Sequence, residues 1–81
     1  MEINWKEHIH SDNDILMGKP VIKGTRISVE LILDLFAKGW TEEMILNNYP
    51  ILKSEDIKAV FVFLTDCLQE ELFFPSPKRV A

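Results

Sequence analysis

Three segments of this chain begin in the same way, with a hydroxyl side chain followed by carboxylates within two positions. They are Ser28-Val29-Glu30, Thr41-Glu42-Glu43 and Ser54-Glu55-Asp56. A Ser or Thr side chain at the N-cap accepts from an unpaired backbone N–H, and acidic residues favour the positive end of the helix dipole. Gly39 and Pro50 supply stop signals between the segments. The sequence therefore predicts three helices, over about residues 28–38, 41–49 and 54–72.

The part of the chain before residue 28 has a different pattern. Short apolar runs such as Val21-Ile22 lie between turn residues, and polar and apolar side chains alternate in His8-Ile9-His10. We expect a small β-ribbon with Lys23-Gly24 at a turn and Pro20 at a strand entry.

Together these patterns predict an α+β fold that is mostly α. A short N-terminal β-ribbon would precede a three-helix, helix-turn-helix-like bundle. With 81 residues in the chain, we expect one domain over residues 1–72, followed by a C-terminal tail over residues 73–81.

The first predicted helix is apolar around most of its circumference. Its charged residues Glu30, Asp34 and Lys38 share one stripe. Such a helix is buried on most sides, in a core or in a subunit interface. Two further short helices and a ribbon are not expected to cover it in so small a domain, so we predict a homodimer.

The third predicted helix has an apolar stripe that we expect to lie in the core. At helical spacing it contains Ile57, Val60, Phe61, Leu64 and Leu68. Cys67 widens this stripe and is interpreted as a buried thiol.

The basic residues indicate where an anionic partner would bind. The net charge is −4, yet residues 1–27 carry four acids and four bases, whereas residues 28–81 carry nine acids and five bases. An anion or DNA contact is therefore expected at Lys19, Lys23 and Arg26. For Arg26 two roles are considered: an intramolecular bond that ties the ribbon to a helix, which we favour, and the anion contact.

The second and third predicted helices, with their connection at residues 47–53, also indicate a helix-turn-helix. The would-be recognition helix starts with Glu55 and Asp56 close to its N-terminus, opposed only by Lys53 and Lys58. Because phosphate contacts normally need cations, this helix alone is a poor DNA-binding surface. A dimer would instead present the bases of the ribbon.

The glycine-containing stretch from Gly18 to Arg26 does not fit a phosphate-binding loop. A Walker loop has four residues between its glycines and then Lys and Ser/Thr. Here five residues separate Gly18 from Gly24, and Thr25-Arg26 follow. We interpret both glycines as turn residues with positive φ, and we expect no small-molecule substrate.

No residues of the sequence form a catalytic constellation. Adjacent carboxylates on a helix diverge, and Cys67 has no histidine near it in sequence. His8, His10 and Asp12 would share a strand face, but no fourth metal ligand follows at a suitable spacing. We predict no enzymatic activity, no metal and no cofactor.

The tail contains Leu72, Phe73 and Phe74 before two prolines and two bases. It either packs onto the core or docks on a partner. Charged residues interrupt any apolar run near the start, and no run is long enough for a membrane span. We therefore expect a cytoplasmic protein without membrane contact.

Between residues 8 and 64 the chain resembles the DUF433 family, small bacterial and archaeal proteins with a domain of unknown function. The resemblance rests on the phrase GKPVI-GTR, a later G-x-x-x-E-x-I segment and a Y-P stop. The matching positions are Gly18, Lys19, Pro20, Val21, Ile22, Gly24, Thr25, Arg26, Val29, Gly39, Glu43, Ile45, Tyr49, Pro50 and Asp56. The chain departs from the family at Met17, where a glycine or small residue is common, and its tail after Thr65 lies outside the motif.

The resemblance implies a homeodomain-like helix-turn-helix fold preceded by short strands. It also implies an antitoxin-like role, with a ribonuclease-type toxin related to PIN domains as the partner. We therefore predict a non-enzymatic antitoxin-like protein whose complex with the toxin binds operator DNA. A stand-alone DNA-binding regulator and a structural dimer module are the alternatives.

Overall fold

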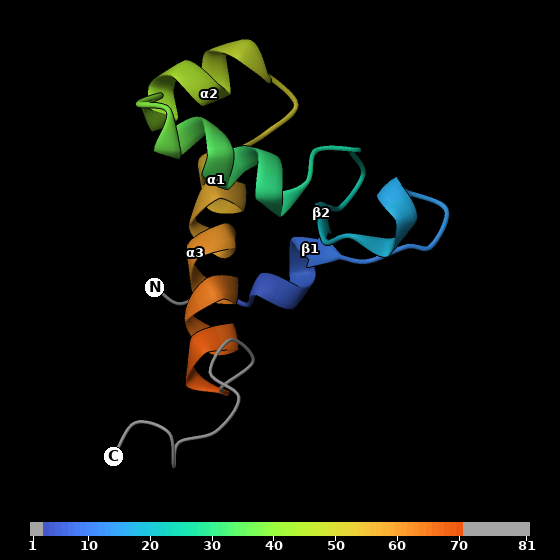
Figure 1. Cartoon of the computed structure of the whole chain (residues 1–81). Helices are drawn as coiled ribbons and strands as arrows, with labels where there is room; N and C mark the ends of the chain where they lie inside the picture. The colour runs from blue at the N-terminus through green and yellow to red at the C-terminus, as the bar shows by residue number, and fades with distance from the viewer. Residues whose placement is uncertain (1–2, 71–81) are drawn as a thin grey trace.

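The computed structural model describes residues 3–70, so the predicted tail with Leu72, Phe73 and Phe74 lies outside the described residues. The described chain forms two short 3₁₀ helices, two short strands and three α-helices (Figure 1). In chain order they are η1 (Trp5–Glu7), β1 (Ile9–His10), η2 (Leu16–Gly18), β2 (Val21–Ile22), α1 (Val29–Ala37), α2 (Glu42–Asn48) and α3 (Ser54–Gln69). The predicted fold class, α+β and mostly α with an N-terminal ribbon, is confirmed.

The two strands pair antiparallel, with Ile9 opposite Ile22 and His10 opposite Val21. The predicted turn follows at once, since the Thr25 backbone N–H donates to the Ile22 carbonyl at 3.0 Å. Gly24 takes a φ of +80° in this turn, which a residue with a Cβ adopts at a cost. The position predicted for the turn is therefore confirmed.

Thr25 holds the turn closed with its side chain. Its Oγ1 donates to the Ile22 carbonyl at 2.8 Å and accepts from the Ile27 backbone N–H at 2.9 Å. On the far side of the loop, the Val29 N–H donates to the Pro20 carbonyl at 3.0 Å. The segment from Pro20 to Val29 is thus a closed loop that places the start of α1 beside β2.

The first two helices begin as their sequences predict. Ser28 Oγ accepts from the Leu31 N–H at 2.9 Å, and Thr41 Oγ1 accepts from the Met44 N–H at 3.1 Å. The stop signals are confirmed as well: Gly39 takes a φ of +96° after the end of α1, and Pro50 lies in a turn closed from Leu52 N–H to the Tyr49 carbonyl.

The predicted N-cap of α3 is wrong by one residue. Lys53 is the N-cap, and Ser54 is the first residue of the helix. The Asp56 carboxylate accepts from the Lys53 backbone N–H at 2.9 Å, as the third residue of a helix does in a capping box. The Ser54 hydroxyl is therefore free to donate to Glu42 Oε2 at 2.7 Å, which joins α3 to the first residue of α2.

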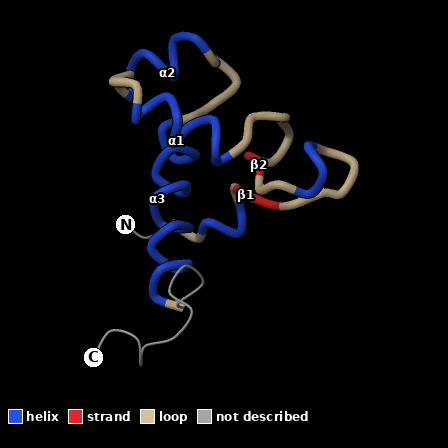
Figure 2. Tube along the Cα trace, in the orientation of Figure 1, coloured by secondary structure: helices blue, strands red, loops and turns tan. Residues whose placement is uncertain are grey.

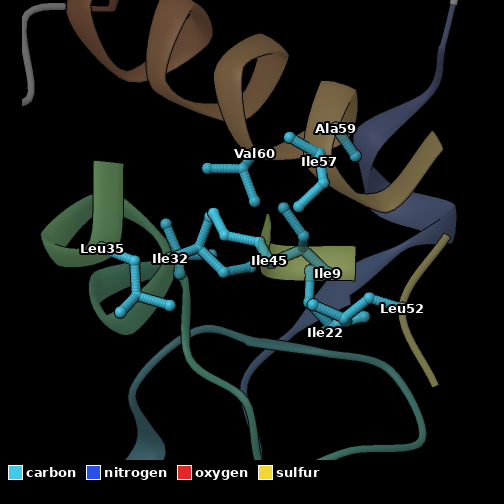
Figure 3. Packing of buried hydrophobic residues seen from close by; sticks show 10 residues of the cluster. Ile9, Ile22, Ile32, Leu35, Ile45, Leu52, Ile57, Ala59 and Val60 are labelled. Carbon is cyan, nitrogen blue, oxygen red and sulfur yellow. The ribbon is translucent and has the colours of Figure 1, made fainter. Parts of the chain in front are cut away.

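The core lies where the ribbon meets the three helices (Figure 3). Ile9 and Ile22 enter it from the ribbon, and Ile32, Ile45 and Ile57 enter it from α1, α2 and α3. Each of the three α-helices thus contributes at least one nearly inaccessible isoleucine, and the ribbon closes one side of the core.

Most of the apolar surface of α1 is covered within the single chain, and the predicted homodimer stays a prediction. Val29, Ile32 and Leu35 are buried within the single chain, and the larger apolar residues on its other sides are partly buried against the same core. The ribbon lies against the start of α1, since Val21 forms a β-bridge with Ser28 and the Val29 N–H donates to the Pro20 carbonyl.

The loop between the strands extends away from the helices, as Figure 2 shows for the part that contains η2. At the other side of the ribbon, η1 packs against α3, with the Trp5 and Phe63 rings in an edge-on arrangement at 4.7 Å between centroids. Within residues 3–70 no helix is long and apolar enough to cross a bilayer.

Candidate interaction surfaces

The predicted basic residues of the ribbon do not form one patch. Lys19 Nζ lies 3.0 Å from Glu30 Oε1, and its surroundings include Asp34, so its charge is opposed by carboxylates of α1. Lys23 and Arg26 are exposed on the two sides of Gly24. The structure therefore keeps two of the three cations available at the turn.

A shallow depression lies beside this turn, lined by His10, Ile15, Gly24, Thr25 and Arg26. The bond predicted to tie Arg26 to a helix is not seen, because the guanidinium makes no hydrogen bond or ion pair within residues 3–70. His10 Nε2 is shielded from solvent and has no hydrogen-bond partner in the same part of the chain. The anion contact considered for Arg26 stays a prediction.

The bases predicted on the third helix lie at its start. Lys53 and Lys58 are both exposed, and Glu55 is exposed between them. The Asp56 carboxylate accepts hydrogen bonds from the Lys53 backbone N–H and from His8, so its charge is not fully exposed to solvent. This end of α3 is close to neutral, which makes it weak as a surface for phosphates.

His8 has a structural contact that sequence reasoning missed. Its Nδ1–H donates to Asp56 Oδ1 at 2.9 Å, with the imidazole three-quarters buried. We expected a solvated strand face at His8, but the residue ends η1 and lies against the start of α3. Because 48 residues separate the pair, no local pattern could reveal it.

The interpretation of Cys67 as a buried thiol is confirmed. Burial raises the pKa of the thiol, and the Glu70 and Asp66 carboxylates add repulsion in the same direction. A thiol in this environment is a poor nucleophile near neutral pH. Within residues 3–70 no three metal-ligating side chains lie close enough to share an ion.

A group of exposed apolar side chains lies on α3, where we predicted core residues. Phe61 and Leu68 are 46% and 47% exposed. They lie seven residues apart and so on one side of the helix, with the half-buried Leu64 beside them. The Phe36 ring of α1 lies 5.5 Å from the Phe61 ring, which extends this surface across two helices. We call these four residues the α3 face.

The spacing of the predicted apolar stripe was correct for a helix, but the stripe contains more residues than the core can bury. Ile57 and Val60 fill the space next to Ile32 and Ile45, and the described core is closed without Phe61 or Leu68. The excess of apolar residues over the available core was the only sequence signal for this surface.

Comparison with known proteins gives a family but no activity. The model of the family described as Protein of unknown function (DUF433) matches residues 9–64. A curated protein of Sinorhizobium fredii (strain NBRC 101917 / NGR234), named Uncharacterized protein y4eO, is 34% identical over 58 residues. That alignment covers 72% of this chain but only 26% of the relative, so the chain spans about a quarter of its length. No solved structure matches the chain.

The family match covers the ribbon, α1, α2 and most of α3, and it includes the turn at Gly24, the stop at Pro50 and the capping Asp56. The chain therefore belongs to the DUF433 family.

Proposed function

We propose that this chain is a non-enzymatic, antitoxin-like protein of the cytoplasm that binds a partner protein through the α3 face. The partner class comes from the family resemblance, which implies a ribonuclease-type toxin related to PIN domains. The observation that carries the proposal is the pair of half-exposed apolar side chains, Phe61 and Leu68, on one side of α3.

The α3 face has the composition of a protein-binding surface. Aromatic side chains are enriched in interfaces because they bury a large area with little loss of rotamer freedom. Apolar residues at a spacing of three or four and seven along one helix fit the groove of a partner. Thr65 and Lys58, both exposed on α3, border these residues and would form the polar rim.

The charge of the chain complements a nuclease. A ribonuclease needs a basic surface for the phosphates of its substrate, and this chain carries a net charge of −4. Opposite net charges accelerate association and favour masking of the basic surface.

Binding to the product of the neighbouring gene tests the proposal. We expect association at micromolar concentration or below, measured by calorimetry and by sedimentation. Phe61→Ser and Leu68→Ser should each raise Kd by roughly 10- to 100-fold, as loss of a buried anchor does. Ile51→Ser is the matched control, since Ile51 is 60% exposed in the turn between α2 and α3, away from the α3 face.

No association of the wild-type chain would refute the antitoxin-like role. The same sedimentation run on the chain alone tests the predicted homodimer. If a second copy occupies the α3 face, the Phe61→Ser variant should sediment as a monomer at concentrations where the wild-type chain is a dimer.

DNA binding by the turn of the ribbon is a second candidate function. Lys23 and Arg26 are exposed beside the shallow depression, and no carboxylate within residues 3–70 pairs with either of them. Binding through these cations would weaken steeply with salt. It would operate in a complex or a dimer that presents two such turns to one DNA.

A further inference from the structure

The loop between β1 and β2 holds an unusual run of left-handed backbone. Leu16, Met17 and Gly18 have φ values of +49°, +59° and +85° in succession. The left-handed region suits glycine, but for Leu and Met it brings the Cβ too close to the backbone. Such strained residues persist only where the surrounding structure holds them, and they cluster at functional sites.

Two local backbone hydrogen bonds hold this run in place. The Gly18 N–H donates to the Ile15 carbonyl at 3.0 Å, and the Lys19 N–H donates to the Leu16 carbonyl at 3.2 Å. A side chain at Gly18 would come within 3.1 Å of Asn13 Oδ1, so the turn is also closely packed on its inner side. The loop is therefore preorganised in its strained form.

The strain is not offset by burial of the side chains that bear it. Met17 is 93% exposed and Leu16 is 42% exposed, and neither packs against the core. In Figure 1 the loop lies at the end of the molecule away from α3. Within residues 3–70 these two residues combine a strained backbone with side chains outside the core, which fits a contact made with another molecule.

The charges of the loop define the surface that it would meet. Asp12 and Asp14 precede the strained run, and Lys19, which follows it, has its Nζ 3.0 Å from Glu30 Oε1, so the charge of Lys19 is opposed. Asp14 is exposed, and its backbone N–H is bound to Asp12 Oδ1 at 2.9 Å, which fixes the direction of the acidic segment. An apolar tip with two carboxylates on its N-terminal side complements an apolar pocket that has basic groups at its rim.

We propose that Leu16 and Met17 form a preorganised apolar knob that inserts into an apolar, basic-rimmed pocket of the partner protein. This inference rests on the proposed function, and it adds a second contact that is separate from the α3 face. A knob held in its bound conformation before binding loses little entropy on association, and the flexible thioether of methionine adapts to the pocket.

The variants Met17→Gly and Met17→Asn test the knob, because both residues tolerate left-handed backbone. We expect the melting temperature of the free chain to stay the same or to rise by a few degrees, since strain is relieved. In contrast, Kd for the product of the neighbouring gene should rise at least tenfold. Ile51→Asn, which removes an exposed apolar side chain elsewhere, should leave Kd unchanged.

The outcomes separate this inference from the proposed function. If Met17→Asn binds as tightly as the wild-type chain while Phe61→Ser does not, the knob is refuted and the α3 face stands. If both Met17 variants melt at a lower temperature, Met17 serves the fold and the inference is wrong. If the wild-type chain binds nothing, both proposals are wrong.

Discussion

Cys67 shows how a single residue takes its chemistry from its surroundings. The thiol is buried on α3, and desolvation disfavours its ionised form most, with Asp66 and Glu70 adding repulsion. Its pKa is therefore raised above the ordinary thiol value, whereas the thiol of an unfolded chain titrates near about 8.5. Folding and thiol ionisation are consequently linked.

We predict that Cys67 makes the chain less stable as the pH rises from 8 to 10. In this range the unfolded chain releases the thiol proton while the folded chain retains it. The free energy of unfolding therefore falls as the pH rises. Urea unfolding at a series of pH values should show this loss for the wild-type chain and a smaller one for Cys67→Ala. Parallel curves for the two proteins would show that the thiol pKa is not raised by folding.

Among the helices, α3 depends most on contacts from outside its own sequence. Asp56 caps it through Lys53 and binds His8, while Asp66 accepts from the Trp5 indole N–H at 2.7 Å. The segment that precedes β1 is thus fixed along α3 at two points, one near its start and one three turns later. The start of α3 and the position of the ribbon are therefore coupled.

Replacement of Asp56 tests this coupling. Asp56→Ala should lower the free energy of unfolding by about 2 kcal/mol, because it removes both a helix cap and a partly buried partner of His8. Asp56→Asn keeps an acceptor for the Lys53 N–H and should cost about half as much. Glu55→Ala, one residue away and exposed, should change stability by less than about 0.5 kcal/mol. Chemical denaturation measures all three, and equal losses for Asp56→Ala and Glu55→Ala would contradict the capping role.

At the scale of the whole molecule, the surface is divided by chemistry. The α3 face is apolar, the loop at Met17 is apolar and is preceded by Asp12 and Asp14, and the turn at Gly24 carries the exposed cations Lys23 and Arg26. This division leaves room for a protein partner and an anionic partner on different parts of one small domain.

A titration with salt tests the basic turn. If operator DNA binds there, the double substitution Lys23→Ala and Arg26→Ala should weaken binding and reduce the slope of log K against log salt by about 2, since two phosphate contacts are lost. Lys58→Ala is the control on α3. A gel shift that is absent at low salt, or a double variant that binds as well as the wild-type chain, would rule out this role for the turn.

The structure also shows which predictions had a sufficient local basis. Ser28 and Thr41 were assigned as caps because the bonds that define them lie within three residues, and Gly24 was placed in a turn for the same reason. Ser54 matched the same pattern, but Asp56 caps the Lys53 N–H and the Ser54 hydroxyl donates to Glu42, so Lys53 is the N-cap and α3 starts one residue earlier than predicted. Local sequence thus predicts the start of a helix well where one side chain can cap it, and less well where two nearby side chains can act as the cap.

The sequence by itself determined the elements and the family, because helix caps, turns and apolar periodicity act over three or four residues. Only the tertiary structure decided which apolar residues are buried, since the core has room for Ile57 and Val60 but not for Phe61 and Leu68. It also decided the pairs Trp5–Asp66 and His8–Asp56, whose members are 61 and 48 residues apart. The candidate surfaces depend on these choices because they consist of the apolar and charged side chains that the packed core leaves outside.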